Sequence, residues 1–223
     1  MGRLFSIRFE TWPLPDRLTF MRLNPVFLLS ATDAAHFPAE SKTHGAPEVA
    51  FLGRSNVGKS SLINALLGSK EARVSSTPGR TRAINFFALH EASGGRQKAV
   101  PSLIFADLPG YGYAKISKSI SAEWPKFIEP YLAERETLAL CICLVDTNIP
   151  PQPSDGQLIL YLKQTQRPFL VVGTKADRLS NNVLGKNVAA LKREHGVEEI
   201  LLVSAKTGAG VPALWQRIMA VAE

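Results

Sequence analysis

The chain is poor in cysteine and histidine, with two and four of them among 223 residues. Cys141 and Cys143 lie two apart in the apolar run LALCICLV, where a strand would place both on one face. We interpret them as small buried side chains in a reducing compartment, because that position suits core packing better than a disulfide. The histidines lack the spacing of a zinc site, and we interpret each as a surface or loop residue. Neither a disulfide nor a zinc ion is therefore expected to hold this fold together.

Long apolar runs are also missing, since none approaches the roughly 18 residues that a membrane-spanning helix needs. Charged residues interrupt the N-terminal stretch, so we expect no secretory signal and predict a cytoplasmic protein without membrane contact. The chain is 45% hydrophobic, which is enough for one sizeable core. We predict a poorly ordered extension over residues 1–22 and one domain over residues 23–223.

Acidic residues are scarcer than basic ones, 19 against 26, which leaves a net charge of +7 and favours an anionic partner. The imbalance is concentrated between Gly68 and Lys98, where six basic side chains stand against two acidic ones. The plain interpretation of such a segment is a solvated face. Contact with a nucleotide or with RNA is the alternative, and the charge alone does not choose between them.

Two glycines frame the most informative stretch of the chain. Residues 53–60, GRSNVGKS, follow an apolar run at 49–52 and precede a helix-like stretch at 61–67. This order of strand, glycine loop and helix matches the phosphate-binding pattern G-x-x-x-x-G-K-[ST]. In that pattern backbone N–H groups surround the phosphates, the lysine (Lys59) reaches the terminal phosphates, and the hydroxyl (Ser60) ligates Mg²⁺. A glycine turn before an amphipathic helix is the alternative interpretation.

Apolar runs alternate with helix-forming stretches along the rest of the chain. Strands are predicted at 26–29, 84–90, 101–106, 138–145, 169–173 and 200–203, and helices at 124–134, 156–166, 181–195 and 211–222. The glycine turn at 92–98 makes the two strands around it an antiparallel pair. We therefore predict a three-layer α/β domain with a mostly parallel sheet, one antiparallel edge pair, and ligands at the carboxyl ends of the strands.

Three short polar motifs stand where predicted strands end. Residues 107–110, DLPG, supply a carboxylate for hydrated Mg²⁺ and a glycine N–H for the terminal phosphate. In residues 174–177, TKAD, the aspartate can accept two hydrogen bonds from guanine that adenine does not offer, and leaving it unpaired costs about 2–5 kcal/mol. Residues 204–206, SAK, offer backbone N–H groups to the guanine carbonyl. Each motif is weak alone, but their convergence at one edge predicts a guanine-nucleotide site.

In this order, GRSNVGKSSLIN, PGRT, DLPGYGYAK, TKAD and SAK resemble the motifs of the EngB/YihA/YsxC family of bacterial ribosome-biogenesis GTPases. That family belongs to the TrmE-Era-EngA-EngB-septin-like superfamily. The resemblance spans residues 25–220 and implies a Ras-like P-loop GTPase domain. It also implies a slow GTPase with Mg²⁺ as cofactor and GTP or GDP as ligand.

The same resemblance implies an assembly switch that acts on the precursor of the large ribosomal subunit and is needed for normal cell division and septation. A division-site interaction protein, for which GTP only shapes the binding face, is the alternative function. We expect the protein to be a monomer.

The resemblance also assigns roles to single residues. Ser60, Thr81 and Asp107 would ligate Mg²⁺, and Thr81 would also sense the γ-phosphate. Thr77 is a competing candidate for this switch threonine, but Thr81 follows Pro-Gly-Arg as the family's threonine does.

Two positions depart from the Ras-type pattern. Tyr111 stands where Ras-type enzymes carry a water-orienting glutamine, and we do not expect a tyrosine to perform that task. The resemblance instead implies that Asn56 helps to hold a potassium ion in place of an arginine finger, whereas the alternative is that Asn56 only shapes the loop. Thr174 replaces an asparagine and loses one amide contact, so guanine selection should rest on Asp177.

The predicted contacts with the nucleotide and its ions come from five loops. They are Gly53, Arg54, Ser55, Asn56, Val57, Gly58, Lys59, Ser60, Ser61, Gly79, Arg80, Thr81, Asp107, Leu108, Pro109, Gly110, Thr174, Lys175, Ala176, Asp177, Val203, Ser204, Ala205 and Lys206. Among them Lys59, Thr81 and Asn56 are predicted to act in catalysis.

Overall fold

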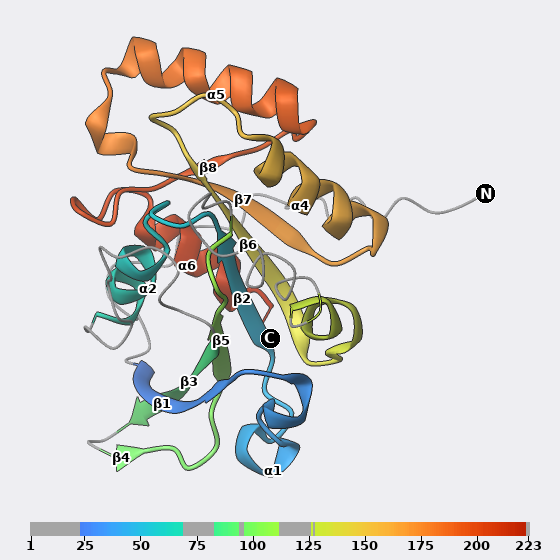
Figure 1. Ribbon diagram of the computed structural model, residues 1–223. Helices are drawn as coiled ribbons and strands as arrows, with labels where there is room; N and C mark the ends of the chain where they lie inside the picture. The colour runs from blue at the N-terminus through green and yellow to red at the C-terminus, as the bar shows by residue number, and fades with distance from the viewer. Residues whose placement is uncertain (1–22, 69–82, 94–95, 112–125, 127, 222–223) are drawn as a thin grey trace.

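The computed structural model describes residues 23–68, 83–93, 96–111, 126 and 128–221 (Figure 1). The extension predicted for residues 1–22 and the segment that carries Thr77 and Thr81 lie outside these ranges. None of the helices within them is long and apolar enough to cross a membrane.

The described residues form an eight-stranded sheet (Figure 1). Its strands are β1 (Leu23–Ala31), β2 (Glu48–Gly53), β3 (Ile84–Ser93), β4 (Arg96–Gln97), β5 (Leu103–Asp107), β6 (Leu138–Asp146), β7 (Phe169–Thr174) and β8 (Leu201–Leu202). The order across the sheet is β1-β3-β5-β2-β6-β7-β8, and β4 pairs with β3. The strands from β5 to β8 in this order run parallel, whereas β3 runs antiparallel to β1 and β5. The predicted mostly parallel sheet with an antiparallel edge is confirmed.

Helices cover both faces of this sheet (Figure 1). They are α1 (Glu40–Thr43), α2 (Lys59–Leu67), α4 (Pro153–Gln164), α5 (Asn181–His195) and α6 (Val211–Met219), with 3-10 turns η1 (Ala34–His36) and η2 (Ala176–Arg178). Residues 128–134 are also helical. Apolar side chains of α2 and α6 pack on one face, and those of α4, α5 and residues 128–134 pack on the other. This gives the three layers that the alternating pattern predicts.

Strand β6 lies at the centre of the two cores. Leu140 and Ile142 point to the side of α2 and α6, while Cys141 and Cys143 point to the side of α4. Both cysteines are free and buried, as the sequence indicates. Burial raises the pKa of the Cys141 thiol to about 12, so this thiol stays protonated at neutral pH.

Some element boundaries differ from the prediction. Helix α4 begins at Pro153 rather than residue 156, because proline suits the first turn of a helix, where its missing N–H costs nothing. Strand β3 continues to Ser93 and pairs with β4, so part of the segment 92–98 is strand rather than turn. Helix α6 ends at Met219, three residues earlier than predicted.

A buried carboxylate fixes β2 at the end opposite its glycine loop. Glu48 is fully buried and accepts hydrogen bonds from Tyr131 Oη at 2.9 Å, Arg135 Nε at 2.8 Å and Thr137 Oγ1 at 2.8 Å. Arg135 also supplies the opposite charge and donates to the Pro38 carbonyl oxygen at 2.9 Å. Because a buried carboxylate is tolerated only when paired and hydrogen-bonded, this cluster ties the start of β2 to the segment before β6.

Two of the four histidines are buried, so the surface interpretation was wrong for them. His90 on β3 lies with Nδ1 2.9 Å from a main-chain carbonyl oxygen. His195 ends α5, and within the described part of the chain neither of its ring nitrogens has a hydrogen-bond partner. A Cβ at Gly156 on α4 would lie 3.3 Å from His195 Nδ1. Burial lowers the pKa of His195, with Glu194 opposing this shift and Lys163 adding to it.

Acidification should destabilise the fold through His195. Because its folded-state pKa lies below the ordinary value of about 6.5, the unfolded chain binds more protons as the pH falls through that value. We therefore expect the melting temperature to drop more in the wild type than in His195→Leu when the pH is lowered from about 7.5 to about 5.5. His36→Gln, changed at an exposed histidine, is the control and should follow the wild type. Equal pH dependence in wild type and His195→Leu would contradict the prediction.

Candidate functional site

The predicted phosphate loop lies between β2 and α2, at the carboxyl edge of the parallel strands (Figure 1). Gly53 ends β2, and a Cβ there would lie 2.8 Å from Val57 Cγ1 because the loop curls back over the strand end. Gly58 has a φ of 104°, which glycine adopts readily and other residues do not. Asn56 has a φ of 65°, in the left-handed region that asparagine tolerates. The two glycines of the motif thus allow the tight bend that the sequence pattern predicts.

Lys59 and Asp107 meet beside this loop. Lys59 is the first residue of α2, Asp107 is the last residue of β5, and their side chains form a buried ion pair. The parallel register of β2 and β5 places Phe51 beside Asp107, which brings the aspartate to the base of the loop. Ser60 follows Lys59 in the first turn of α2. Lys59, Ser60 and Asp107, three of the residues predicted for the terminal phosphates and Mg²⁺, therefore come from adjacent elements.

The chain after Asp107 continues alongside the phosphate loop. Ser55 N donates to the Tyr111 carbonyl oxygen at 2.9 Å, and Tyr111 N donates to the Gly53 carbonyl oxygen at 3.4 Å. A Cβ at Gly110 would lie 3.0 Å from Ser55 N, so glycine permits this close approach. Gly110, whose N–H is predicted to meet the terminal phosphate, is consequently held against the predicted phosphate loop.

The hydroxyl group of Tyr111 contacts helix α4. It donates to Asp155 Oδ1 at 3.0 Å. Burial raises the pKa of Asp155 to about 6, although the hydrogen bond from Tyr111 and the charge of Arg54 lower it. Burial, followed by the nearby charge of Asp155, also raises the pKa of Tyr111 well above its ordinary value. The hydroxyl is thus engaged with Asp155 on α4.

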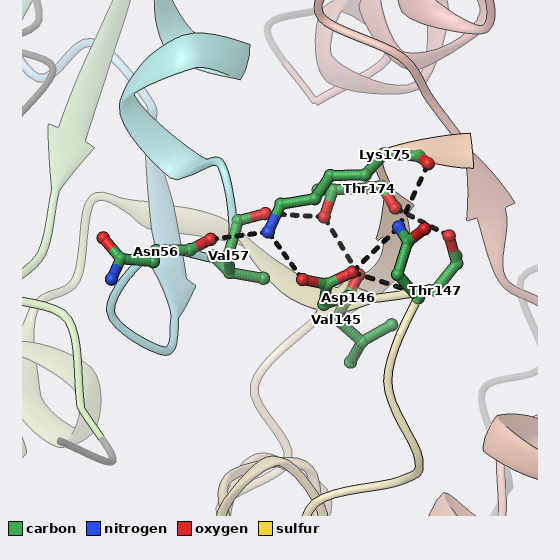
Figure 2. A network of polar contacts seen from close by, with 8 residues as sticks. Asn56, Val57, Val145, Asp146, Thr147, Thr174 and Lys175 are labelled. Atoms are coloured by element: carbon green, nitrogen blue, oxygen red, sulfur yellow. Dashed lines mark hydrogen bonds and ion pairs between the residues drawn. The ribbon is translucent and has the colours of Figure 1, made fainter. Parts of the chain in front are cut away.

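Thr174 links the base motif to the phosphate loop. Its Oγ1 lies 2.6 Å from the Val57 carbonyl oxygen and 3.2 Å from the Val145 carbonyl oxygen, and the side chain is buried (Figure 2). The Thr174 carbonyl oxygen accepts a hydrogen bond from Thr147 Oγ1 at 2.8 Å. The threonine hydroxyl therefore holds the end of β7 against the phosphate loop from which it is distant in sequence.

Lys175 makes a second link. It has a φ of 59°, uncommon for a residue with a side chain, and its Nζ lies 2.7 Å from the Asn56 carbonyl oxygen. The same Nζ lies 2.6 Å from Asp146 Oδ2 at the end of β6 (Figure 2). Burial opposes ionisation of Asp146, but the hydrogen bonds from Lys175 and Asn148 outweigh it and lower the pKa. The carboxylate is therefore ionised at neutral pH and pairs with the ammonium group.

The predicted guanine-binding residues come together from two loops. Asp177 lies in η2, and its Oδ1 accepts a hydrogen bond from Ser204 Oγ at 2.7 Å. This hydrogen bond is the main cause that lowers the pKa of Asp177, so the exposed carboxylate is charged at neutral pH. Ala176 N donates to the Val203 carbonyl oxygen at 3.3 Å. Hydrogen bonds therefore join the segments 174–177 and 203–206.

Four of the five predicted loops thus meet at one edge of the sheet, and the fifth, which contains Gly79, Arg80 and Thr81, lies outside the described residues. Sequence reasoning missed Asp146 and Asn148. A signal for them existed, because they follow an apolar strand just as the other polar motifs do.

Comparison with known proteins agrees with this arrangement. Residues 48–175 match a family model described as 50S ribosome-binding GTPase. A relative from Acidobacterium capsulatum, called probable GTP-binding protein EngB, is 65% identical over 202 residues, which cover 91% of this chain and 92% of the relative.

Solved structures give the same fold. A crystal structure of a probable GTP-binding protein engB has a TM-score of 0.61 and 24% identity, covering 78% of this chain and 98% of that one. A crystal structure of Era with MgGDPNP and part of 16S ribosomal RNA has a TM-score of 0.63 and 26% identity, covering 79% of this chain and 56% of that one.

Fold, loop arrangement and family match together define a P-loop GTPase, an enzyme that binds guanine nucleotide and hydrolyses GTP. The high sequence identity to its relatives also indicates the family within this class. The chain belongs to the EngB family of GTP-binding proteins, which confirms the resemblance found in its motifs.

Tyr111→Phe should leave GTP turnover nearly unchanged. Because the hydroxyl is engaged with Asp155, we expect a change of less than about threefold in phosphate release and a loss of about 1 kcal/mol in the free energy of unfolding. Tyr131→Phe, which removes another hydroxyl bonded to a buried carboxylate, is the control for stability, measured by urea unfolding. A turnover loss of about tenfold or more in Tyr111→Phe alone would assign the hydroxyl to the reaction instead.

Proposed function

We propose that this GTPase is an assembly switch in the biogenesis of the large ribosomal subunit, and that normal cell division and septation depend on it. The observation that carries this proposal is the match of residues 48–175 to a family described as 50S ribosome-binding GTPase. The solved complex of Era with ribosomal RNA adds support from a structural neighbour. The net charge of +7 suits a phosphate-rich partner.

The glycine loop is the proposed phosphate site. Backbone N–H groups over residues 53–58 would surround the phosphates, and Lys59 would exchange its contact with Asp107 for the terminal phosphates. Ser60, Asp107 and Thr81 are hydroxyl and carboxylate donors of the kind that Mg²⁺ prefers, and the Era complex contains MgGDPNP. Bound Mg²⁺ would neutralise charge that develops on the phosphate oxygens.

The proposed base site lies across the sheet edge from this loop. Asp177 presents an ionised, exposed carboxylate that is oriented by Ser204, as acceptance of two guanine hydrogens requires. Backbone N–H groups at Ala205 and Lys206 would meet the guanine carbonyl. The aliphatic stem of Lys175 would lie along the base, because its Nζ is already fixed at the phosphate loop.

Switching is proposed to start at Gly110 and Thr81, which would respond to the γ-phosphate. Backbone hydrogen bonds join Tyr111 to the phosphate loop, so this residue would respond to a change at the phosphates. The segment after Gly110, together with Arg80 and Arg82, would then meet the ribosomal surface in the GTP state and leave it after hydrolysis. We propose that the protein does this in the cytoplasm as a monomer.

Slow hydrolysis is proposed to depend on a potassium ion held with the help of Asn56. The left-handed backbone at Asn56, whose carbonyl oxygen binds Lys175, supports a fixed orientation of this residue within the loop. Turnover in potassium chloride should exceed turnover in sodium chloride, and Asn56→Ala should remove the difference. Equal turnover in both salts would leave Asn56 with a loop-shaping role only.

Asp177→Asn should move nucleotide preference from GTP towards xanthosine triphosphate. The amide can no longer accept both guanine hydrogens, so we expect GTP affinity to fall by roughly 30-fold or more, as for a lost partner of a paired charge. Xanthine offers an acceptor to the new amide donor, so the affinity of the variant for xanthosine triphosphate should rise. Equilibrium titration with both nucleotides measures this, with Glu198→Gln as an exposed acidic control. Unchanged discrimination would remove Asp177 from the base site.

The ribosomal role predicts binding that depends on the nucleotide. Protein loaded with a non-hydrolysable GTP analogue should co-sediment with large-subunit particles, and protein loaded with GDP should do so at least about tenfold more weakly. Because phosphate contacts dominate such binding, added salt should release the complex. Binding in neither state, together with binding to division-site proteins in the GTP state, would favour the alternative of a division-site interaction protein.

A further inference from the structure

The contact between Lys175, Asn56 and Asp146, here called the lysine bridge, joins the phosphate loop to the ends of β6 and β7 through one charged side chain (Figure 2). Lys175 Nζ lies 2.7 Å from the Asn56 carbonyl oxygen and 2.6 Å from Asp146 Oδ2. Asp146 belongs to β6, which lies between the strands that carry the phosphate loop and the base motif. A single ammonium group is thus shared between the phosphate loop and a carboxylate on the intervening strand.

Several hydrogen bonds hold the Asp146 side chain in position. Its Oδ1 accepts hydrogen bonds from Asn148 N at 2.9 Å and Asn148 Nδ2 at 3.1 Å. Asn148 Nδ2 also lies 3.2 Å from the Lys175 carbonyl oxygen. One carboxylate oxygen is therefore used to shape the loop after β6, which leaves Oδ2 directed at Lys175 Nζ (Figure 2).

The ion pair is sheltered enough to restrict the lysine. The side chains of Asp146 and Lys175 are 11% and 21% exposed. Charge-assisted hydrogen bonds of this kind contribute more than neutral ones. Fixing the flexible four-carbon lysine stem costs side-chain entropy, which is lost on folding rather than on nucleotide binding. A Cβ at Gly58 would lie 3.9 Å from Lys175 Cε, so the fixed stem runs against the phosphate loop.

We propose that Asp146 is a positioning residue for nucleotide binding, which acts through Lys175 and sets how slowly GTP and GDP leave the site. The inference rests on the proposed place of the Lys175 stem beside guanine. Fixing Nζ before the nucleotide arrives removes an entropic cost from binding, and it keeps the phosphate loop and the base motif at a constant separation. Among the described residues, the bridge bonds neither Gly110 nor the metal-ligand candidates Ser60 and Asp107, so both nucleotides should depend on it equally.

The test compares Asp146→Asn with Lys175→Met, which keeps most of the stem but loses the ammonium group. Each should speed dissociation of labelled GDP and of a labelled GTP analogue by the same factor, roughly tenfold or more. For Asp146→Asn, KM for GTP should rise while the single-turnover rate of hydrolysis of bound GTP stays the same, because the change weakens binding rather than the chemical step. The double variant should dissociate no faster than Lys175→Met, because both changes break one interaction.

Asn187→Ala is the matched control, since its Nδ2 supports the same loop by donating to the Thr147 carbonyl oxygen at 2.7 Å without touching the lysine bridge. It should change dissociation by less than about twofold. An equal effect in Asn187→Ala, additive effects in the double variant, or unchanged dissociation in Asp146→Asn would each overturn the proposal. If Asp146→Asn fails to fold, Lys175→Met with unchanged dissociation would overturn it equally. Failure of the wild type to bind GTP would instead reject the proposed function.

Discussion

The parallel register of the central strands is the constraint on which this site depends. It places Phe51 of β2 beside Asp107 of β5, and Asp146 of β6 beside Thr174 of β7. A slip of one residue in any of these pairs would turn every side chain of that strand to the other face of the sheet. Asp107 would then leave the phosphate loop and enter an apolar core. Apolar side chains on both faces of the strands make such a slip costly, so the core and the site are specified together.

The sequence was sufficient for those features that depend on local pattern. The alternation of apolar runs, the glycines of the phosphate loop and the polar residues at strand ends predict the layers and the edge at which the motifs meet. Contacts between residues that lie far apart in the sequence could not be predicted from it. The Thr174 hydroxyl bonds the Val57 carbonyl oxygen across 117 residues, and Asp146 pairs with Lys175 across 29. His195 is buried because α5 packs beside Gly156 of α4, which no helix pattern reveals.

The replacement of asparagine by Thr174 has a simple structural account. An asparagine at this position of the motif could contact the phosphate loop through its amide, and the threonine keeps that contact through its hydroxyl with the Val57 carbonyl oxygen. The extra methyl group is buried with the rest of the side chain. The second link is made by the longer side chain of Lys175, whose ammonium group is charged. A short neutral hydrogen bond and a shared ammonium group thus hold the same two loops by different physical means.

The three side chains that bond Glu48, those of Tyr131, Arg135 and Thr137, restrict how this sequence can vary. Each donor in the cluster satisfies a charge that has no access to water, so the loss of any one leaves a buried acceptor whose penalty exceeds what the bond itself contributes. A wholly apolar replacement of the set could be neutral, whereas each intermediate step would reduce the free energy of unfolding. During evolution, Glu48 and its three donors are therefore expected to change together rather than one at a time.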